Sequence, residues 1–429
     1  MQEEIERNVS CIRDVLSYNR IDIRDIHVVE GPVLSLYKIY VVPGVKIQKV
    51  KELAVDFAMA MGVASVRTVT LLDSIGVEVP NRERKYMPLE EMLESSPFLD
   101  NYDDELPVVI GHTIDGKVRV IDLVDAPHIL VSGATKQGKT MFLKGLYASL
   151  KASRNMLNVK VEWIDPKARD ADFTKIAETL EMYCAEMDRR FDCFWNADVS
   201  DIRNYNRRNA DRMPYIVIFI DEYADLSYPK QIWKSVVTSI ILLAQKGRIA
   251  GIHLIIATQR PTVDVITGLI KANFPTRVAF RTSSRIDSMT ILDVSGAEKL
   301  IGNGDMLFSS GVELERVQGA YVSQDEVNAV GEHVGSQYGY QKSSNVPYYL
   351  PEQEKPAQQE RDKMFEDAAR LVVTTQKASV TELQRLLGIG FARASKIMDQ
   401  LESEKVVSPS QRSVLVNNMT DLGKILNGM

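Results

Sequence analysis

The central part of the chain alternates short apolar runs with amphipathic stretches. The apolar runs are of strand length and include VKVEWID, YIVIFID, GIHLIIAT and TRVAFRT. Near-continuous apolar strands separated by helices are typical of a mostly parallel sheet that helices cover on both faces. We therefore predict an α/β domain over residues 101–349.

Two segments with different patterns lie on either side of this domain. Within residues 1–100, apolar and polar positions alternate over residues 33–42 and 65–72, and between them Leu53, Phe57 and Met61 lie four apart. This pattern predicts strand, helix and strand, a small α/β module that packs or spaces rather than catalyses. On the other side, residues 350–362 are rich in Gln, Glu and Pro and lack aromatic residues. We interpret them as a linker.

The last segment, residues 363–429, has the pattern of a separate small domain. Apolar positions from Phe365 to Val372 predict a first helix, and SVTE at residues 379–382 is a capping-box signal for a second. LGIG then predicts a turn into a third helix, and VVSPSQRSVLVNN resembles a two-stranded wing. Helix, helix, turn, helix and hairpin together predict a winged helix-turn-helix domain.

Composition excludes some classes of protein. The 429 residues are 45% hydrophobic and 26% charged with a net charge of −6, so the chain is not a generally basic nucleic-acid binder, and any DNA contact must come from local clusters. No apolar run approaches the roughly 18 residues of a membrane span, and the polar, acidic start does not resemble a signal peptide. Three widely spaced cysteines lack metal-ligand spacing and suit a reducing compartment. We expect a cytoplasmic protein without a membrane segment in this chain.

The most specific motif is SGATKQGKT, which has the spacing G-x-x-x-x-G-K-[ST]. An apolar strand precedes it at residues 126–132 and an amphipathic helix follows it, an arrangement that aims a helix N-terminus at an anion. In such a loop the backbone N–H groups hold phosphates, Lys139 reaches the β and γ phosphates, and Thr140 offers a hydroxyl to Mg²⁺. We predict an ATP and Mg²⁺ site at Gly133, Ala134, Thr135, Lys136, Gln137, Gly138, Lys139 and Thr140.

Two further strands end in residues suited to hydrolysis. PYIVIFIDE ends in Asp221, expected to hold Mg²⁺, and Glu222, expected to orient and deprotonate the attacking water. Taken alone, this strand could instead end in a solvated acidic turn. GIHLIIATQR places Gln259 where a polar side chain can sense the γ-phosphate, although a structural turn amide is the alternative.

A long stretch carries a resemblance to a known family. It runs AQKGRIAGIHLIIATQRPTVDVITGLIKANFPTRVAFRTSSRIDSMTILD and is followed by GAEKLIGNGDML. With IDPK, EMDRRF, RNYN and RVQGAYVS, it resembles the FtsK/SpoIIIE family of DNA translocases. The first segment is similar to the α module of that family and the last to its winged-helix γ module. The resemblance covers essentially the motor, without the membrane anchor and long linker of cell-division members.

This resemblance implies a RecA-like ATPase that forms a homo-hexameric ring around double-stranded DNA and pumps it. It implies that Arg248 is an arginine finger for the neighbouring subunit, and that Arg260, Lys271 and Arg285 lie on loops that face the pore and grip phosphates. Within the winged helix, the basic residues that could contact DNA are Arg385, Arg393 and Lys396.

The sequence departs from the family at several positions. Lys136 stands where the family has a small residue, and Met289 replaces a residue that is basic in many relatives. Ala392 stands where Asn is common, and Ala cannot bond a base edge, which weakens the expectation of sequence-directed loading.

The sequence is also compatible with two other functions. One is an ATPase that moves polypeptides in secretion, since relatives of this motor do so. The other is a P-loop ATPase whose winged helix binds a protein partner such as a recombinase.

Overall fold

The computed structural model forms two compact units, residues 1–342 and 343–429, which we describe separately. It describes residues 2–100, 105–153, 158–168, 171–228, 230–311, 313–322, 364–375 and 379–387, with isolated positions between 393 and 416. Among these residues no helix is both long and apolar enough to cross a membrane.

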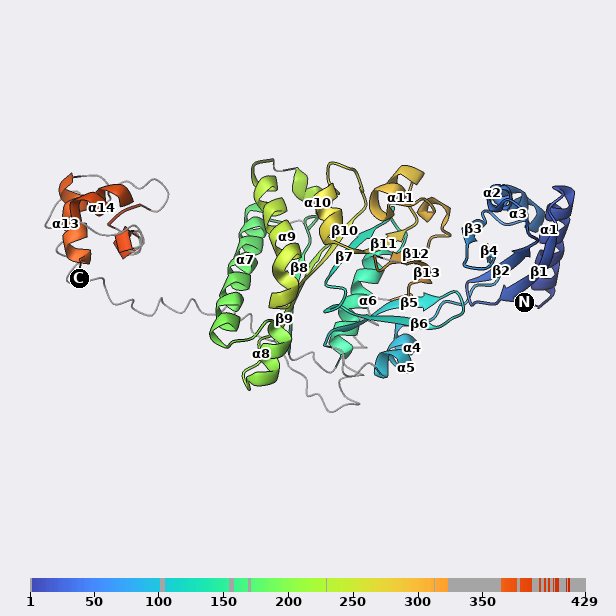
Figure 1. Cartoon of the computed structure of the whole chain (residues 1–429), viewed down its shortest axis with the longest axis horizontal. Helices are drawn as coiled ribbons and strands as arrows, with labels where there is room; N and C mark the ends of the chain where they lie inside the picture. The colour runs from blue at the N-terminus through green and yellow to red at the C-terminus, as the bar shows by residue number, and fades with distance from the viewer. Residues whose placement is uncertain are drawn as a thin grey trace. The chain divides into compact units, whose positions relative to one another are not determined.

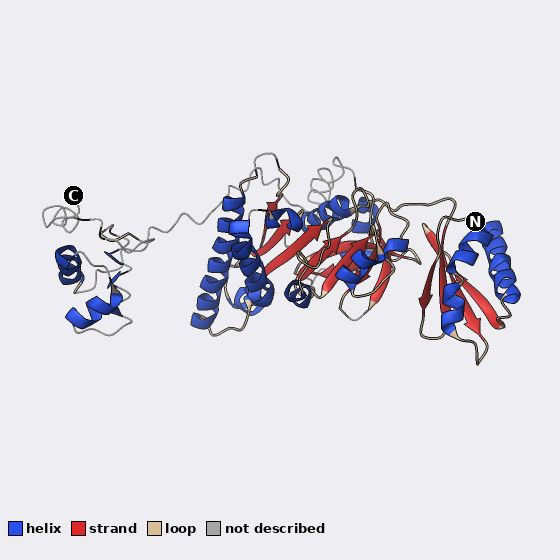
Figure 2. Cartoon of the chain, turned by 90° about the horizontal axis from the view of Figure 1, so that it is seen from above, coloured by secondary structure: helices blue, strands red, loops and turns tan. Residues whose placement is uncertain are grey.

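The N-terminal module is a four-stranded antiparallel sheet in the order β1-β2-β4-β3, with helices packed on it (Figure 2). Its elements are α1 (Gln2–Tyr18), β1 (Ile23–Val29), β2 (Leu34–Val41), α2 (Ile47–Glu52), α3 (Ala54–Met61), β3 (Arg67–Thr70) and β4 (Ile75–Pro80). The apolar core includes Ile12 and Leu16 of α1, Phe57 of α3 and Val77 of β4. The sequence pattern predicted β2, α3 and β3 but missed α1, β1 and β4.

The second sheet has nine strands in the order β6-β5-β13-β12-β11-β7-β10-β9-β8 (Figure 1). Its strands are β5 (Pro107–Thr113), β6 (Val118–Asp122), β7 (His128–Ser132), β8 (Val159–Ile164), β9 (Tyr215–Ile220), β10 (Ile252–Thr258), β11 (Thr276–Phe280), β12 (Asp305–Ser309) and β13 (Leu314–Gln318). Strands β8, β9, β10, β7 and β11 are parallel, while β12, β13, β5 and β6 extend the sheet in antiparallel pairs. The predicted α/β class is confirmed, and the antiparallel extension was not predicted.

Helices cover both faces of the parallel strands, as the buried strand patterns require. Alternate residues of β9 divide between two cores: Ile218 packs with α7 (Phe173–Asn196) and α9 (Lys230–Ala250), and Val217 packs on the side of α6 (Lys139–Ala152). The remaining helices are α4 (Leu89–Leu93), α5 (Ser96–Leu99), α8 (Ile202–Arg208), α10 (Gly268–Asn273) and α11 (Arg285–Leu292). Because β8, β9, β10, β7 and β11 are parallel, their carboxyl ends lie along one edge of the sheet.

The second unit has a small apolar core of its own. Helices α13 (Phe365–Thr375) and α14 (Val380–Leu387) contribute Phe365 and Leu383, and helical backbone recurs at 393–394, 397–398 and 400–401. An antiparallel bridge joins Val407 to Val414, in the stretch predicted to be the wing. The predicted linker, residues 350–362, lies outside the described residues.

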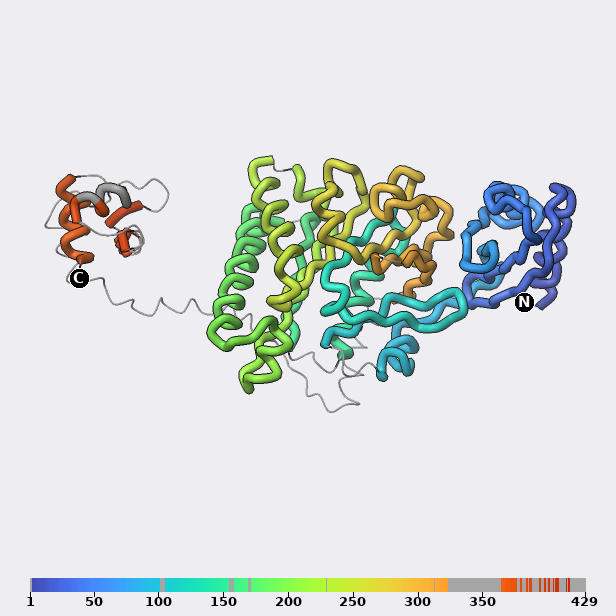
Figure 3. Tube along the Cα trace, in the orientation of Figure 1, coloured from blue at the N-terminus to red at the C-terminus, as the bar shows by residue number. Residues whose placement is uncertain are grey.

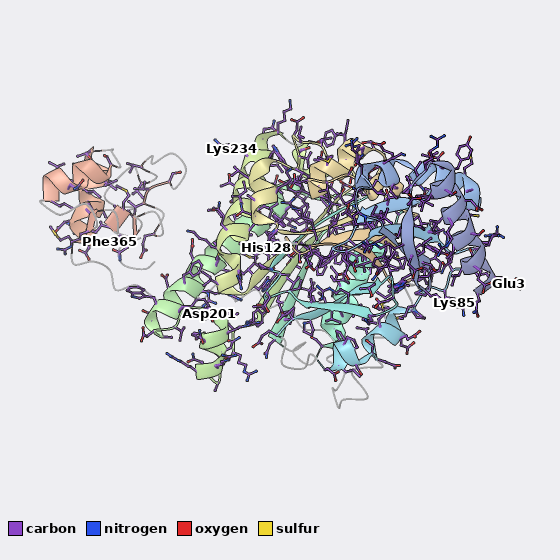
Figure 4. The ribbon with its side chains drawn as sticks, turned by 45° about the vertical axis from the view of Figure 1, so that its right-hand side comes forward. Glu3, Lys85, His128, Asp201, Lys234 and Phe365 are labelled. Carbon is purple, nitrogen blue, oxygen red and sulfur yellow. The ribbon has the colours of Figure 1, made fainter. Side chains whose placement is uncertain are left out.

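Two histidines are buried side by side in the centre of the nine-stranded sheet. The rings of His128, on β7 and labelled in Figure 4, and His253, on β10, are 6.4 Å apart. His128 Nδ1 accepts from the N–H of Leu254 at 3.1 Å, and His253 Nδ1 lies 3.2 Å from the carbonyl of Pro127. Burial lowers the pKa of His128 to about 3 and that of His253 to about 4. Both rings are therefore neutral in the folded protein near pH 7.

These histidines predict a loss of stability in mild acid. Their pKa values are lower in the folded chain than the ordinary value of 6.5, so the unfolded chain binds more protons below that pH. Stability that is present above pH 6.5 should fall by about 1.4 kcal/mol per histidine for each unit of pH below it. The thermal midpoint, measured from pH 7.5 to 5.5, should drop less steeply in His128→Gln/His253→Gln than in the wild type. Equal slopes in the wild type and the double variant would contradict the assignment.

Candidate active site

The loop between β7 and α6 can adopt its shape only with glycine at two positions. A Cβ on Gly133 would lie 2.6 Å from the Cβ of Phe280, closer than side chains approach. Gly138 has φ of 119°, and a Cβ there would lie 2.9 Å from the Cα of Gly304. Both glycines therefore let β11 and the turn before β12 pack directly on the loop that opens α6.

Backbone hydrogen bonds fix this loop against neighbouring strands. The N–H of Ala134 donates to the carbonyl of Arg281 at 2.9 Å, and the N–H of Gly304 donates to the carbonyl of Gln137 at 2.9 Å. Thr135 donates its hydroxyl to Oε1 of Gln259 at 3.0 Å, which ties the loop to the end of β10. Lys136 is exposed, with φ of 65°, and lines the cavity beside the loop. The loop is thus held in place with the first turn of α6 open to that cavity.

The carboxylates that follow β9 meet the lysine of this loop. Lys139 Nζ lies 3.4 Å from Asp221 Oδ1 and 3.4 Å from Glu222 Oε2. Lys139 and Glu222 are only 4% and 2% exposed, so their charges are screened little by water. The structure therefore brings together three of the predicted site residues at the carboxyl edge of the parallel strands.

Glu222 is held on both carboxylate oxygens. Its Oε1 accepts from the hydroxyl of Thr258 at 2.7 Å and from the N–H of Gln259 at 3.0 Å, while Lys167 Nζ donates to Oε2 at 3.1 Å. Its backbone has φ of 148° and ψ of 76°, a conformation that side-chain-bearing residues rarely adopt. Strained backbone of this kind persists only where surrounding contacts over-determine it, and it is concentrated at functional sites.

The two adjacent carboxyls have opposite pKa shifts. Burial raises the pKa of Asp221, and the charge of Lys139 offsets this only in part. Burial also acts to raise the pKa of Glu222, but the charge of Lys139 and the bonds from Thr258, Gln259 and Lys167 outweigh it, so the net shift is downward. Glu222 is therefore an ionised hydrogen-bond acceptor near neutral pH.

The other predicted cations of the motor are Arg260, Lys271 and Arg285. Arg260 donates to the hydroxyl of Tyr228 at 3.0 Å, and Arg285 is an exposed residue at the start of α11. Lys271 Nζ is paired with Asp293 at 2.6 Å and is only partly exposed. The sequence indicated all three as cations available to a ligand, but Lys271 already has an acidic partner.

Arg248 lies near the end of α9 and is 60% exposed. Its guanidinium lies 3.9 Å from the carboxylate of Asp125. In the second unit Arg393 is exposed, whereas the side chain of Arg385 and the whole of Ala392 and Lys396 lie outside the described residues.

Sequence reasoning missed several residues of the site. Lys167 and Thr258 both donate hydrogen bonds to Glu222, but the sequence patterns predicted no role for either side chain. The signal was available, because Lys167 follows β8, the neighbour of β9 in the parallel sheet. Tyr86 and Tyr321 line the cavity beside the loop, and nothing in their local sequence predicted this.

The cavity has a volume of about 520 Å³. Its lining includes Lys139 and Thr140 of the loop, Gln259, and the aromatic residues Tyr86, Phe142 and Tyr321. A pocket lined by a cationic loop and by aromatic residues has the chemistry to hold a phosphorylated nucleoside.

The parallel sheet, the glycine loop and the acidic end of β9 define a P-loop protein. Model comparisons agree: the FtsK/SpoIIIE family matches residues 88–263, the FtsK alpha domain residues 1–81 and the Ftsk gamma domain residues 359–417. The chain belongs to the FtsK/SpoIIIE family.

Relatives of known name span most of the chain. It is 38% identical to the DNA translocase FtsK of Chlorobaculum tepidum, over 96% of this chain and 56% of that protein. It is 39% identical to the DNA translocase SpoIIIE of Bacillus subtilis, over 89% of this chain and 52% of that protein. The chain thus spans about half the length of these relatives. A solved monomer of the pCW3 conjugation coupling protein TcpA with ATPγS shares the fold, with a TM-score of 0.54 at 21% identity, over 76% of this chain and 99% of that one.

The glycine loop yields a prediction with a matched control. Gly133→Ala should force Phe280 and the loop apart and weaken ATP binding by about tenfold or more, on the scale of overpacking costs. Gly268→Ala is the control, because a Cβ at Gly268 meets no atom within 4 Å. Calorimetric titration of ATP into both variants, with thermal midpoints to check folding, measures the difference. Equal affinities in the two variants would contradict the close approach of β11 to the loop.

Proposed function

We propose that this protein is an ATPase that uses hydrolysis to move along double-stranded DNA. The observation that carries the proposal is that Lys139, which lines a cavity of about 520 Å³, lies 3.4 Å from the carboxylates of both Asp221 and Glu222. The names of the two curated relatives, both DNA translocases, favour duplex DNA over a polypeptide as the substrate. Action on DNA would take place in the cytoplasm.

ATP would bind with its phosphates over the loop and Lys139. The described residues contain no cluster of three or more His, Cys, Asp or Glu able to hold a metal without help. Mg²⁺ typically uses one or two protein oxygens and completes its shell with water and phosphate oxygens. The Thr140 hydroxyl, which lines the cavity, and the Asp221 carboxylate supply such oxygens. Bound Mg²⁺ would neutralise charge on the phosphates during transfer.

Glu222 would act as the base toward the attacking water. It is ionised, buried and held on both oxygens, and a fixed carboxylate can both orient a water molecule and accept its proton. Lys139 would exchange its contacts with the two carboxylates for the phosphates when ATP binds. Gln259, hydrogen-bonded to Thr135 of the loop, would then report the presence of the γ-phosphate to β10.

Arg248 would complete the site of a neighbouring copy in a hexameric ring. Its side chain is 60% exposed near the end of α9 and lies 3.9 Å from Asp125, so it is accessible to a second subunit. An arginine supplied in trans stabilises transition-state charge and makes hydrolysis depend on the subunit interface.

DNA would be held by exposed cations at the edge of the motor and by the C-terminal domain. Arg260 and Arg285 are the stronger candidates, whereas Lys271 would first have to leave Asp293. In the winged helix, Arg385, Arg393 and Lys396 would contact DNA, and the same domain could instead meet a protein partner such as a recombinase.

The direct test is ATP hydrolysis with and without long linear duplex DNA. We expect duplex to stimulate the wild type, Lys139→Ala to lose nucleotide binding, and Glu222→Gln to bind ATP while hydrolysing it at least about 100-fold more slowly. Separate measurements of binding and turnover distinguish these two defects. Hydrolysis by Glu222→Gln near the wild-type rate would remove it from the role of base, and a wild type indifferent to duplex would overturn translocation.

A mixing experiment tests the role of Arg248. Arg248→Ala and Glu222→Gln subunits should each be nearly inactive alone but regain part of the activity when combined, because some interfaces then pair an intact arginine with an intact base. Hydrolysis is measured across mixing ratios with mixed assembly verified by mass. Verified mixed rings that never exceed the activity of the separate variants would exclude action in trans.

The proposed DNA contacts predict a change in salt dependence. Arg260→Ala/Arg285→Ala should weaken duplex binding and lower the slope of log K against log salt by about 2, one counterion for each lost phosphate contact. Arg13→Ala/Arg24→Ala, which removes two exposed cations from the N-terminal module, is the control and should keep the wild-type slope. Identical slopes in both double variants would mean that the motor edge does not touch DNA.

A further inference from the structure

Two tyrosines that line the cavity come from segments that are far apart in the sequence. Tyr86 comes from residues 81–88, which follow β4 and which we call the connector, whereas Tyr321 follows β13. A parallel bridge between Pro88 and Tyr321 holds the two segments together. Both rings are partly or largely exposed, at 37% and 68%, so their faces are open to a ligand.

The connector is fixed to the N-terminal module up to the residue before Tyr86. The N–H of Lys85 donates to the carbonyl of Pro32 at 2.9 Å, and Asn81 donates from its side chain to the carbonyl of Gly31 at 2.7 Å. The path of the chain from β4 into α4 can be followed in Figure 3, and Lys85 is labelled in Figure 4. Tyr86, which lines the cavity, therefore directly follows Lys85, whose N–H is bonded to the N-terminal module.

We propose that Tyr86 and Tyr321 form the nucleobase subsite, and that nucleotide bound there fixes the connector and with it the N-terminal module. The proposal rests on nucleotide binding at the loop, as argued above. With phosphates at Lys139, the base of a nucleoside triphosphate would lie elsewhere in the same cavity, where Tyr86 and Tyr321 supply flat aromatic surface. Aromatic side chains stack on bases readily, because each base has a π-face.

Inorganic tripolyphosphate distinguishes phosphate binding from base binding, since it has the phosphates of ATP without base or ribose. Tyr321→Ala and Tyr86→Ala should each weaken ATP binding by about tenfold, the order expected when a base loses a stacked ring. Neither should change the affinity for tripolyphosphate. Tyr86→Phe and Tyr321→Phe should restore ATP binding, because they keep the ring, and Tyr18→Ala, at a 91% exposed tyrosine of α1, is the control.

Trypsin gives a readout that does not depend on affinity. Arg84 and Lys85 are exposed in the connector, so saturating ATP should slow cleavage there in the wild type and in Tyr86→Phe. Saturating tripolyphosphate should not protect, and Tyr86→Ala should be cleaved at the same rate with or without ATP.

The outcomes distinguish this inference from the proposed function. Equal losses of ATP and tripolyphosphate affinity in the alanine variants, unchanged ATP affinity, or equal protection by both ligands would each overturn the nucleobase subsite while leaving ATP binding at the loop intact. A wild type that binds neither ligand would instead overturn the proposed function itself.

Discussion

The buried carboxylate of Glu222 is the feature on which the rest of the site depends. A charge 2% exposed is costly unless it is paired and hydrogen-bonded. Here Lys139, Lys167, Thr258 and the backbone of Gln259 supply the partners, and they come from α6, the end of β8 and the end of β10. The carboxyl edge of the parallel strands is thereby joined around one group. Nucleotide phosphates that attract Lys139 would take one positive charge away from Glu222.

A second buried ion cluster joins the N-terminal module to the motor. Arg316 of β13, 5% exposed, donates to Glu78 of β4 at 2.6 Å and to both oxygens of Asp305 at the start of β12, with 2.7 Å to the nearer one. Asp305 directly follows Gly304, which lines the cavity. Breaking one member of such a cluster leaves an uncompensated charge, so the contact favours a defined arrangement of the two parts. With the connector at Tyr86, two independent contacts link the module to the edge of the cavity.

Local sequence was enough to predict the glycine loop, β9 with its two carboxylates, and the parallel strands, because each depends on residues adjacent in the chain. It was not enough for α1, β1 or β4, or for the antiparallel strands β5, β6, β12 and β13, whose pairing is decided by distant partners. The same limit explains the site. Lys167 contacts Glu222 from beyond the end of the neighbouring strand, Tyr321 is joined to the connector by its bridge with Pro88, and Lys271 is paired with Asp293. Each of these partners is distant in the chain.

Lys167 donates to Glu222 and would remain there as a cation once Lys139 turns to the phosphates. Removing it should raise the pKa of Glu222, because a positive charge that favours the ionised form is lost. The decisive measurement is the pH profile of maximal ATP hydrolysis in Lys167→Met, with Lys175→Met at an exposed position of α7 as control. The acid limb should move to higher pH in Lys167→Met and stay in place in the control. An acid limb that stays at the wild-type pH in Lys167→Met, or moves lower, would contradict Glu222 as a base held by Lys167.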